Sequence, residues 1–320
     1  MWKTILKRFL LMIPQLILLS ILVFVLAKLM PGDPLTGAIT PQTSAAQLAK
    51  LRQEYGLNDP WWTQYWHWIV NMFHGDLGQS YGFKRSVAGL IGERAVNTFW
   101  LSLLTIIIMY LVAIPLGVVA GRFQDTWKDK AIQLWTFVAL AIPGFVFYLF
   151  GLTVFGYILQ WLPTGGYVSL DVNPGTVAYW LSRLQHMILP AILAGLLSTA
   201  GTIQYLRSGV IDNTNEDFVR TARSKGVPER VVFSKHILRN SLLPIAAFMG
   251  NQITGLLGGS VFVEQIFGYP GMGQLFISSI QSRDYSVITA LILLFGFLTL
   301  LGNLLSDIIM SIVDPRIRID

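Results

Sequence analysis

The sequence predicts an all-α integral membrane protein, and two observations carry that prediction. The first is composition: 53% of the 320 residues are hydrophobic and only 12% are charged, whereas charged residues make up roughly 25% of a soluble domain. The mean hydropathy is +0.58. The second is the gathering of apolar residues into long stretches, since a helix needs about 20 of them to cross a bilayer.

Six stretches have the length of a membrane span, roughly 9–30, 97–121, 131–161, 187–206, 241–263 and 286–312. The first is too long for the apolar region of a signal peptide and leads into no small-residue cleavage site, so we expect a retained helix. Proline can kink a helix that moves, but it is also common in membrane helices at large. It lies in or beside five of the stretches, at Pro14, Pro115, Pro143, Pro190 and Pro244.

The fifth stretch has a face of small residues, Gly250, Gly255, Gly258, Gly259 and Ser260. Such a face allows close helix packing, and it could equally line a pore. In the last stretch Asp307 is the main buried ionisable residue, with Asn303 and Ser306 nearby. We expect a hydrogen-bond network that packs helices there rather than a proton relay.

Positive charge is distributed unequally between the two sides of the predicted membrane protein. Most Lys and Arg lie in the N-terminus, the 122–130 loop, the 207–240 loop and the C-terminus. Cytoplasmic segments are enriched in these residues, so we expect both termini and the 207–240 loop to be cytoplasmic. This distribution also explains the net charge of +6, and nucleic acid is not expected as a partner.

The chain divides into three parts: residues 1–30 with the first span, an external segment 31–96, and a core of five spans at 97–320. The external segment is rich in Trp, at positions 61, 62, 66 and 68, and Ser44–Tyr55 has apolar residues at helical spacing. A small helical subdomain on the outer membrane surface is the expected structure.

The 207–240 loop is polar and basic between two apolar stretches. Its helix signals are Thr214 with Asp217 for a start, Lys225 and Gly226 for an end, and Pro228 for the first turn of a second helix. These signals predict two short helices built to contact another protein.

Motifs of catalysis are missing from the sequence. It has no phosphate-binding GxxxxGK[ST] loop, no GxSxG, HExxH or CxxC, and no cysteine. The four histidines are scattered without carboxylates at metal-ligand spacing. We therefore expect no enzyme activity and neither cofactor nor metal in this chain. Ion-coupling charges within the spans are also scarce, which argues against a secondary transporter.

The run FVRTARSKG at 218–226, followed by HILRN at 236–240, resembles the EAA loop of ABC importer permeases, whose coupling helices dock on the ATP-binding subunit. That motif usually has Glu at the position of Arg220, and Arg is typical of peptide importers. Further matches follow in the family's order along nearly the whole chain. They resemble the first permease of oligopeptide and dipeptide importers, at 5–37, HGDLGQS (74–80), AIPGF (141–145), MILPA (187–191), PGMGQLF (270–276), SRDYSV (282–287) and DPRIR (314–318).

The resemblance implies the type I importer permease fold in a bacterial or archaeal cytoplasmic membrane. It implies a heterodimer with a second related permease, two ATP-binding subunits that hold ATP and Mg, and an external peptide-binding protein. The residues it assigns to coupling are Phe218, Arg220, Thr221, Ala222, Arg223, Lys225 and Gly226. Those it assigns to binding-protein docking are Tyr269, Pro270, Gly271, Gly273, Arg283 and Asp284.

Physical reasoning supports the coupling roles. Gly226 accepts backbone angles that form an elbow, Ala222 leaves room for a partner surface, and the basic residues could pair with acidic residues of the partner or with anionic lipid. The alternatives are an importer of nickel, glutathione or sugar oligomers, a channel or secondary transporter, and a membrane scaffold. No substrate-contacting residue is assigned.

Overall fold

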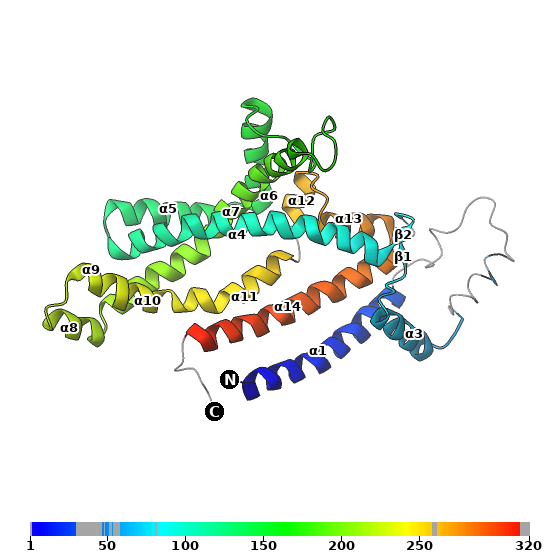
Figure 1. The fold of residues 1–320 in the computed structure, drawn as a ribbon, viewed down its shortest axis with the longest axis horizontal. Coiled ribbons are helices and arrows are strands. Elements are labelled where there is room, and N and C mark those ends of the chain that lie inside the picture. Colours follow the sequence, from blue (N-terminus) through cyan, green and yellow to red (C-terminus); the bar gives the residue numbers. More distant parts are fainter. Residues whose placement is uncertain are drawn as a thin grey trace.

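The computed structural model describes residues 2–29, 47, 49–50, 53, 58–80, 82–257 and 261–313, and its described part is mostly helical (Figure 1). A two-stranded antiparallel hairpin joins β1 (Gln79–Ser80) to β2 (Arg85–Ser86). The helices are α1 (Trp2–Leu29), α3 (Trp61–Phe73), α4 (Val87–Arg122), α5 (Trp127–Ala141), α6 (Gly144–Gly151), the π-helix η2 (Leu152–Ile158), α7 (Val177–Thr214), α8 (Asp217–Ser224), α9 (Glu229–Val231), the π-helix η3 (Val232–Ile237), α10 (Leu238–Ser241), α11 (Leu243–Leu257), α12 (Val261–Ile266), α13 (Met272–Ser282) and α14 (Tyr285–Val313).

The long helices lie side by side, with α8 and α9 at one end of the molecule and the hairpin and α13 at the other (Figure 1). α4 and α7 form the central pair and pack closely. A Cβ on Gly121 would lie only 2.6 Å from the Cβ of Val210, so glycine is what lets these two helices approach. Gly250 has the same effect on α11 and α14, where a Cβ would lie 2.3 Å from the Ser306 nitrogen.

The described helices provide fewer complete spans than the six predicted. Four are long and apolar enough to cross a membrane, in α1, α4, α7 and α14, and a fifth is reached if α5 and the α6–η2 helix count as one span. That pair is bent by 105°. The predicted span 131–161 is therefore not a straight helix, because Pro143 at the break lacks a backbone N–H and caps α6 instead.

The predicted span 241–263 is also divided. α11 has 15 residues, about 22 Å at 1.5 Å per residue, and ends at Leu257. α12 then begins at Val261. By contrast Pro14, Pro115 and Pro190 lie inside α1, α4 and α7, which continue through them.

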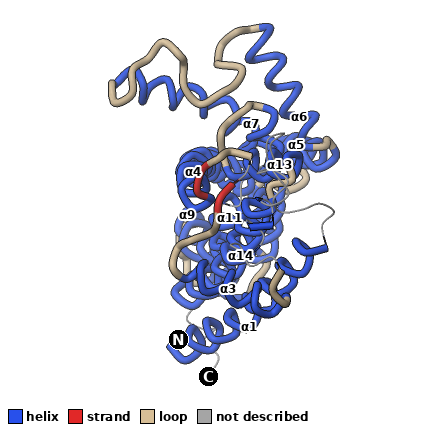
Figure 2. Tube along the Cα trace, turned by 90° about the vertical axis from the view of Figure 1, so that its right-hand side faces the viewer, coloured by secondary structure: helices blue, strands red, loops and turns tan. Residues whose placement is uncertain are grey.

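The segment from α6 through η2 to the start of α7 projects from the side of the molecule opposite α1, as both views show (Figures 1 and 2). The predicted boundary between the external segment, which ends at residue 96, and the core falls inside a helix, because α4 begins at Val87. The predicted helical run 44–55 and the terminal DPRIR lie largely or wholly outside the described residues.

Asp307 of α14 forms an ion pair with Arg8 of α1, with 2.6 Å between Arg8 Nη1 and Asp307 Oδ2. This contact fits the expected packing role of Asp307 better than a proton relay. Its partner in this ion pair is a basic residue of the first helix, which the sequence pattern around Asp307 does not indicate. The ion pair joins the beginning of α1 to the end of α14.

Candidate functional site

The two-helix loop begins later than its sequence signals indicate. Thr214 is the last residue of α7, and its hydroxyl donates to the Val210 carbonyl at 2.6 Å. The N-cap of α8 is Glu216, which makes no side-chain capping bond. The predicted start at Thr214 is therefore wrong. α7 keeps a buried apolar face as far as Val210, and this packing extends the helix past the point where capping chemistry alone would begin a new one.

The end of α8 confirms the helix-stop signal predicted at Lys225 and Gly226. Lys225 is the C-cap, and Gly226 has φ +72°, in the left-handed region that favours glycine. The Gly226 N–H donates to the Arg223 carbonyl at 2.9 Å, and the Val227 N–H donates to the Ala222 carbonyl at 3.2 Å. These two bonds form a Schellman motif. Pro228 then caps α9, so the loop is a defined elbow.

The inner face of α8 is packed within the chain. Val219 is fully buried and Ala222 is 6% exposed. They belong to an apolar cluster with Leu206, Val210, Val232, Ile237 and Ile245. Ala222 therefore lies on the face of α8 that packs against its own chain, and its contact with a partner surface stays a prediction. A small residue is needed there because α8 lies close against its own chain.

The outer face of α8 carries the remaining predicted coupling side chains: Phe218, Arg220, Thr221, Arg223 and Lys225 are all exposed. Arg223 bridges the elbow by donating two hydrogen bonds to the carboxylate of Glu229, at 2.8 and 3.1 Å. This pairing lowers the pKa of the Glu229 carboxyl and raises that of Arg223. The structure thus brings one aromatic and several basic side chains together on one surface.

Two contacts behind the loop were not found by sequence reasoning. Arg207 of α7 donates to both carboxylate oxygens of Asp129 at the start of α5, at 2.7 and 2.8 Å, and Asp129 is buried. Arg122 at the end of α4 lies over the ring of Phe233, 4.8 Å from its centroid. These contacts tie the base of the loop to α4 and α5, and only the three-dimensional structure reveals them.

The opposite end of the molecule contains a buried hydrogen-bond cluster around Glu264 of α12. Its carboxylate accepts from the Thr98 hydroxyl at 2.8 Å and from the backbone N–H groups of Gly273 and Gln274 at 2.7 and 3.0 Å. The Thr98 oxygen also accepts from the Met272 N–H at 2.8 Å. Burial raises the pKa of the Glu264 carboxyl, while its three donors oppose that shift. The cluster fixes the start of α13 against α4.

A second group of contacts extends this cluster to α7. Asn97 of α4 accepts from Arg183 at 2.7 Å and donates to the Pro270 carbonyl at 2.9 Å. The Tyr269 hydroxyl donates to the Asn97 carbonyl at 3.3 Å, and burial raises the pKa of Tyr269 to about 12. The loop before α13 is thus held from two helices.

Of the residues predicted to dock a binding protein, Tyr269, Gly271, Gly273 and Asp284 are buried within this chain. Asp284 accepts from the Ser80 hydroxyl at 2.5 Å and from the Gly82 N–H at 3.0 Å, and so ties the hairpin to α14. Pro270 is partly exposed and Arg283 is exposed. The docking role stays a prediction, and those two side chains are the ones an external partner could reach directly.

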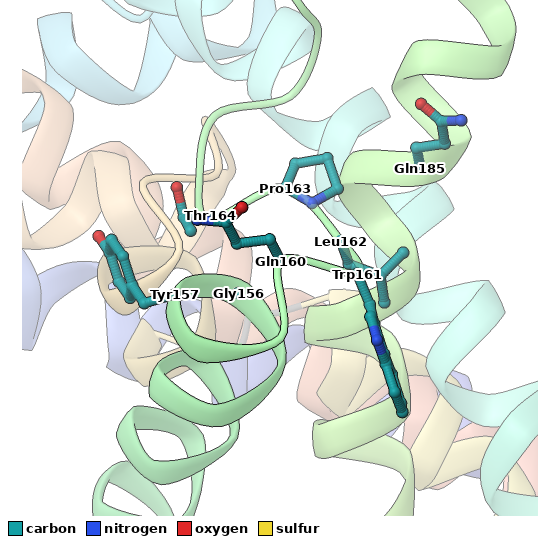
Figure 3. Close-up of a pocket in the computed structure, with 8 residues that line it drawn as sticks. All are labelled: Gly156, Tyr157, Gln160, Trp161, Leu162, Pro163, Thr164 and Gln185. Atoms are coloured by element: carbon teal, nitrogen blue, oxygen red, sulfur yellow. The ribbon is translucent and has the colours of Figure 1, made fainter.

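A cavity of about 580 Å³ lies on the projecting segment (Figure 3). Gln185 comes from α7, and the other lining residues follow one another through the end of η2 and the next loop: Gly156, Tyr157, Gln160, Trp161, Leu162, Pro163 and Thr164. None of them carries a full charge. Among the described residues no group of three His, Asp or Glu side chains could hold a metal ion.

These features define a class: a helical, multi-pass membrane protein with a structured, exposed basic loop at one end. Comparison with known families identifies it further. Residues 113–319 match the model of the binding-protein-dependent transport system inner membrane component, and residues 1–93 match its N-terminal companion. The chain therefore belongs to this family of inner-membrane transport components.

Two curated relatives are similar over nearly their full lengths. The oligopeptide transport system permease protein AppB of Bacillus subtilis is 42% identical over 315 residues, which cover 98% of each chain. The glutathione transport system permease protein GsiC of Escherichia coli K12 is 36% identical over 318 residues, 99% of each chain. This chain is accordingly a permease subunit of an ABC importer, a family in which ATPase activity lies in separate subunits.

A solved structure supports the fold. A chain of the inward-facing MetNI methionine ABC transporter matches with a TM-score of 0.54 and 13% identity, covering 70% of this chain and 96% of that one. At this identity the likeness concerns the type I permease fold alone. The family as a whole implies a second permease, ATP-binding subunits and a substrate-binding protein as partners.

Proposed function

We propose that this chain is one permease of an ATP-driven oligopeptide importer, forms half of the translocation pathway with a second, different permease, and couples to two ATP-binding subunits through residues 214–240. The exposed surface of α8, set on a rigid elbow, carries the proposal. Its RTARSKG sequence is typical of peptide importers, and AppB, named for oligopeptide transport, is 42% identical.

The packing of α8 explains how force could pass from an ATP-binding subunit to the pathway. Val219 and Ala222 join α8 to residues of α7, η3 and α11 in one apolar cluster. Closely packed interiors transmit a displacement instead of absorbing it. When the ATP-binding subunits close on ATP, α8 moves with them and carries the inner ends of α7 and α11. The two states of the pathway then differ in their affinity for the closed subunits, which is the condition for coupling.

The orientation of the chain follows the same proposal. The coupling surface faces the cytoplasm, and the Arg8–Asp307 pair joins the start of α1 to the end of α14 in the half of the molecule nearer α8 (Figure 1). Both termini are then cytoplasmic. ATP and Mg are held by the partner subunits, and this chain needs no cofactor. Because the sequence has no cysteine, single cysteines near Arg8 and on α13 can be tested for labelling from either side of intact cells.

A glutathione importer is a second candidate, because GsiC is 36% identical over 99% of this chain. The two are separated by transport in proteoliposomes that contain the whole importer and its binding protein. Uptake of labelled peptides of several sequences, with glutathione failing as a competitor, supports the oligopeptide function. ATP-dependent uptake of glutathione alone would contradict the oligopeptide function and support a glutathione importer.

A further inference from the structure

α3 has three distinct faces, and the first is packed on α1. The Tyr65 hydroxyl shares a hydrogen bond with the Ser20 hydroxyl at 2.7 Å. The rings of Tyr65 and Trp68 lie 5.4 and 5.8 Å from the ring of Phe24. Lys28 also donates a hydrogen bond to Gln64. These contacts hold one side of α3 firmly against the first membrane span.

The contacts with α1 also show at which level along the first span α3 lies. Ser20, Phe24 and Lys28 are spaced four residues apart, so they extend about 12 Å along one side of α1 at 1.5 Å per residue. The stretch of α1 that is long and apolar enough to cross a membrane runs from Ile5 to Leu29. α3 therefore lies beside the last turns of the span and not beyond its end.

The second face of α3 is apolar and exposed. Trp62, Trp66 and Phe73 are 76%, 65% and 82% exposed. Ile69 completes the row, and spacings of four and seven residues place all four side chains on one side of a helix. The third face carries the exposed polar residues His67 and Asn71. α3 contains no Asp, Glu, Lys or Arg.

We propose that α3 lies in the membrane–water interface at the end of α1 away from the N-terminus, with Trp62, Trp66 and Phe73 inserted between lipid headgroups and the upper acyl chains. Large aromatic side chains favour this region because one part of the ring system is apolar while the indole N–H remains near water. The polar face with His67 and Asn71 then faces the aqueous side.

Continuity with the exposed surface of α1 favours lipid over a protein partner. Leu22, Leu26 and Leu29, in the same turns that α3 contacts, are 51%, 49% and 65% exposed. In a span these side chains face acyl chains, and the aromatic row of α3 continues that apolar surface at the depth where headgroups begin. Amphipathic helices of this kind bind through buried apolar area. α3 thereby fixes the depth and tilt of the first span, a role that does not depend on the cargo.

Single cysteines allow a direct test, since the natural sequence contains none. Trp66→Cys and Trp62→Cys place a nitroxide label on the apolar face, and Asn71→Cys is the matched control on the polar face of the same helix. The labelled chain is measured in the complete importer in lipid nanodiscs, by power saturation with oxygen and with a water-soluble nickel chelate. Labels at 62 and 66 should be more accessible to oxygen than to nickel, and the label at 71 should show the reverse.

Two results would overturn the proposal. Nickel accessibility at 62 and 66 equal to that at 71 would place the aromatic row in water. Low accessibility to both reagents at 62 and 66 would show that protein, such as the second permease, covers this face. The two aromatic positions are measured separately, so a local distortion at one of them does not decide the result.

Discussion

Substitution of Gly226 tests the elbow at the end of α8. A Cβ at this position would meet no atom within 4 Å, so a side chain causes no clash and acts only through the backbone angle φ of +72°. Holding an ordinary L-residue in the left-handed region costs about 1–2 kcal/mol, and more for a β-branched residue, whereas Asn tolerates it. We therefore expect the order Gly, Asn, Ala, Val from least to most disturbed.

This conformational cost opposes formation of the two hydrogen bonds of the Schellman motif, from Gly226 to Arg223 and from Val227 to Ala222. A loss of about 1–2 kcal/mol changes the ratio of closed to opened elbow by a factor of roughly 5–30. An opened elbow should transmit motion poorly. In proteoliposomes with all partner subunits, Gly226→Val is expected to lower peptide uptake per ATP hydrolysed, and membrane insertion should be unchanged because it depends on the spans.

Two outcomes would refute this reasoning. Uptake per ATP in Gly226→Val equal to that of the natural chain would mean that the elbow is not required for coupling. Equal damage from Gly226→Asn and Gly226→Val would mean that some property of glycine other than its left-handed conformation is needed.

Three further predictions concern named contacts. Replacing Arg223 with Glu should weaken copurification of the ATP-binding subunits, whereas Arg223→Lys should retain most of it; unchanged recovery with Glu would leave Arg223 only a topological role. Asp129→Asn should destabilise the chain by about 1.5–3 kcal/mol, the range for a hydrogen bond to a charged group, because it weakens the paired contact with Arg207. A thermal midpoint in detergent equal to that of the natural chain would contradict it. Thr98→Val should cost about 1–3 kcal/mol by leaving the buried Met272 N–H without its acceptor, while Thr98→Ser preserves the hydroxyl; equal midpoints for the two variants would refute the bridging role.

The sequence predicts the helical membrane class and the end of α8 well, because long apolar stretches and the Lys225–Gly226 pair are local signals. Hydropathy reports how apolar a stretch is and not the direction of its helix axis, so it does not predict the 105° bend at Pro143. The burial of Ala222 within its own chain is not predicted for a similar reason: a small residue indicates a close approach but does not say to which surface.

Contacts between distant residues are harder still to predict. Thr98 and Glu264 are separated by 166 positions, and no local pattern links them. Once α4 and α12 are adjacent, Glu264 is explained as the acceptor for the start of α13. The same holds for Asp129 and Arg207, which are 78 positions apart. The predicted docking residues belong to a local sequence motif. The burial of Tyr269 and Asp284, however, depends on residues far away in the sequence, so the motif does not predict it.

The proposed function requires that the exposed face of α8 contacts an ATP-binding subunit. The most direct measurement places a photo-crosslinking amino acid at Phe218 of the natural importer in native membranes, with Leu170 as an exposed control position in the loop before α7. We expect a crosslinked product that contains an ATP-binding subunit from position 218 and none from position 170. No such product from 218, in membranes where the importer remains assembled and active, would contradict it.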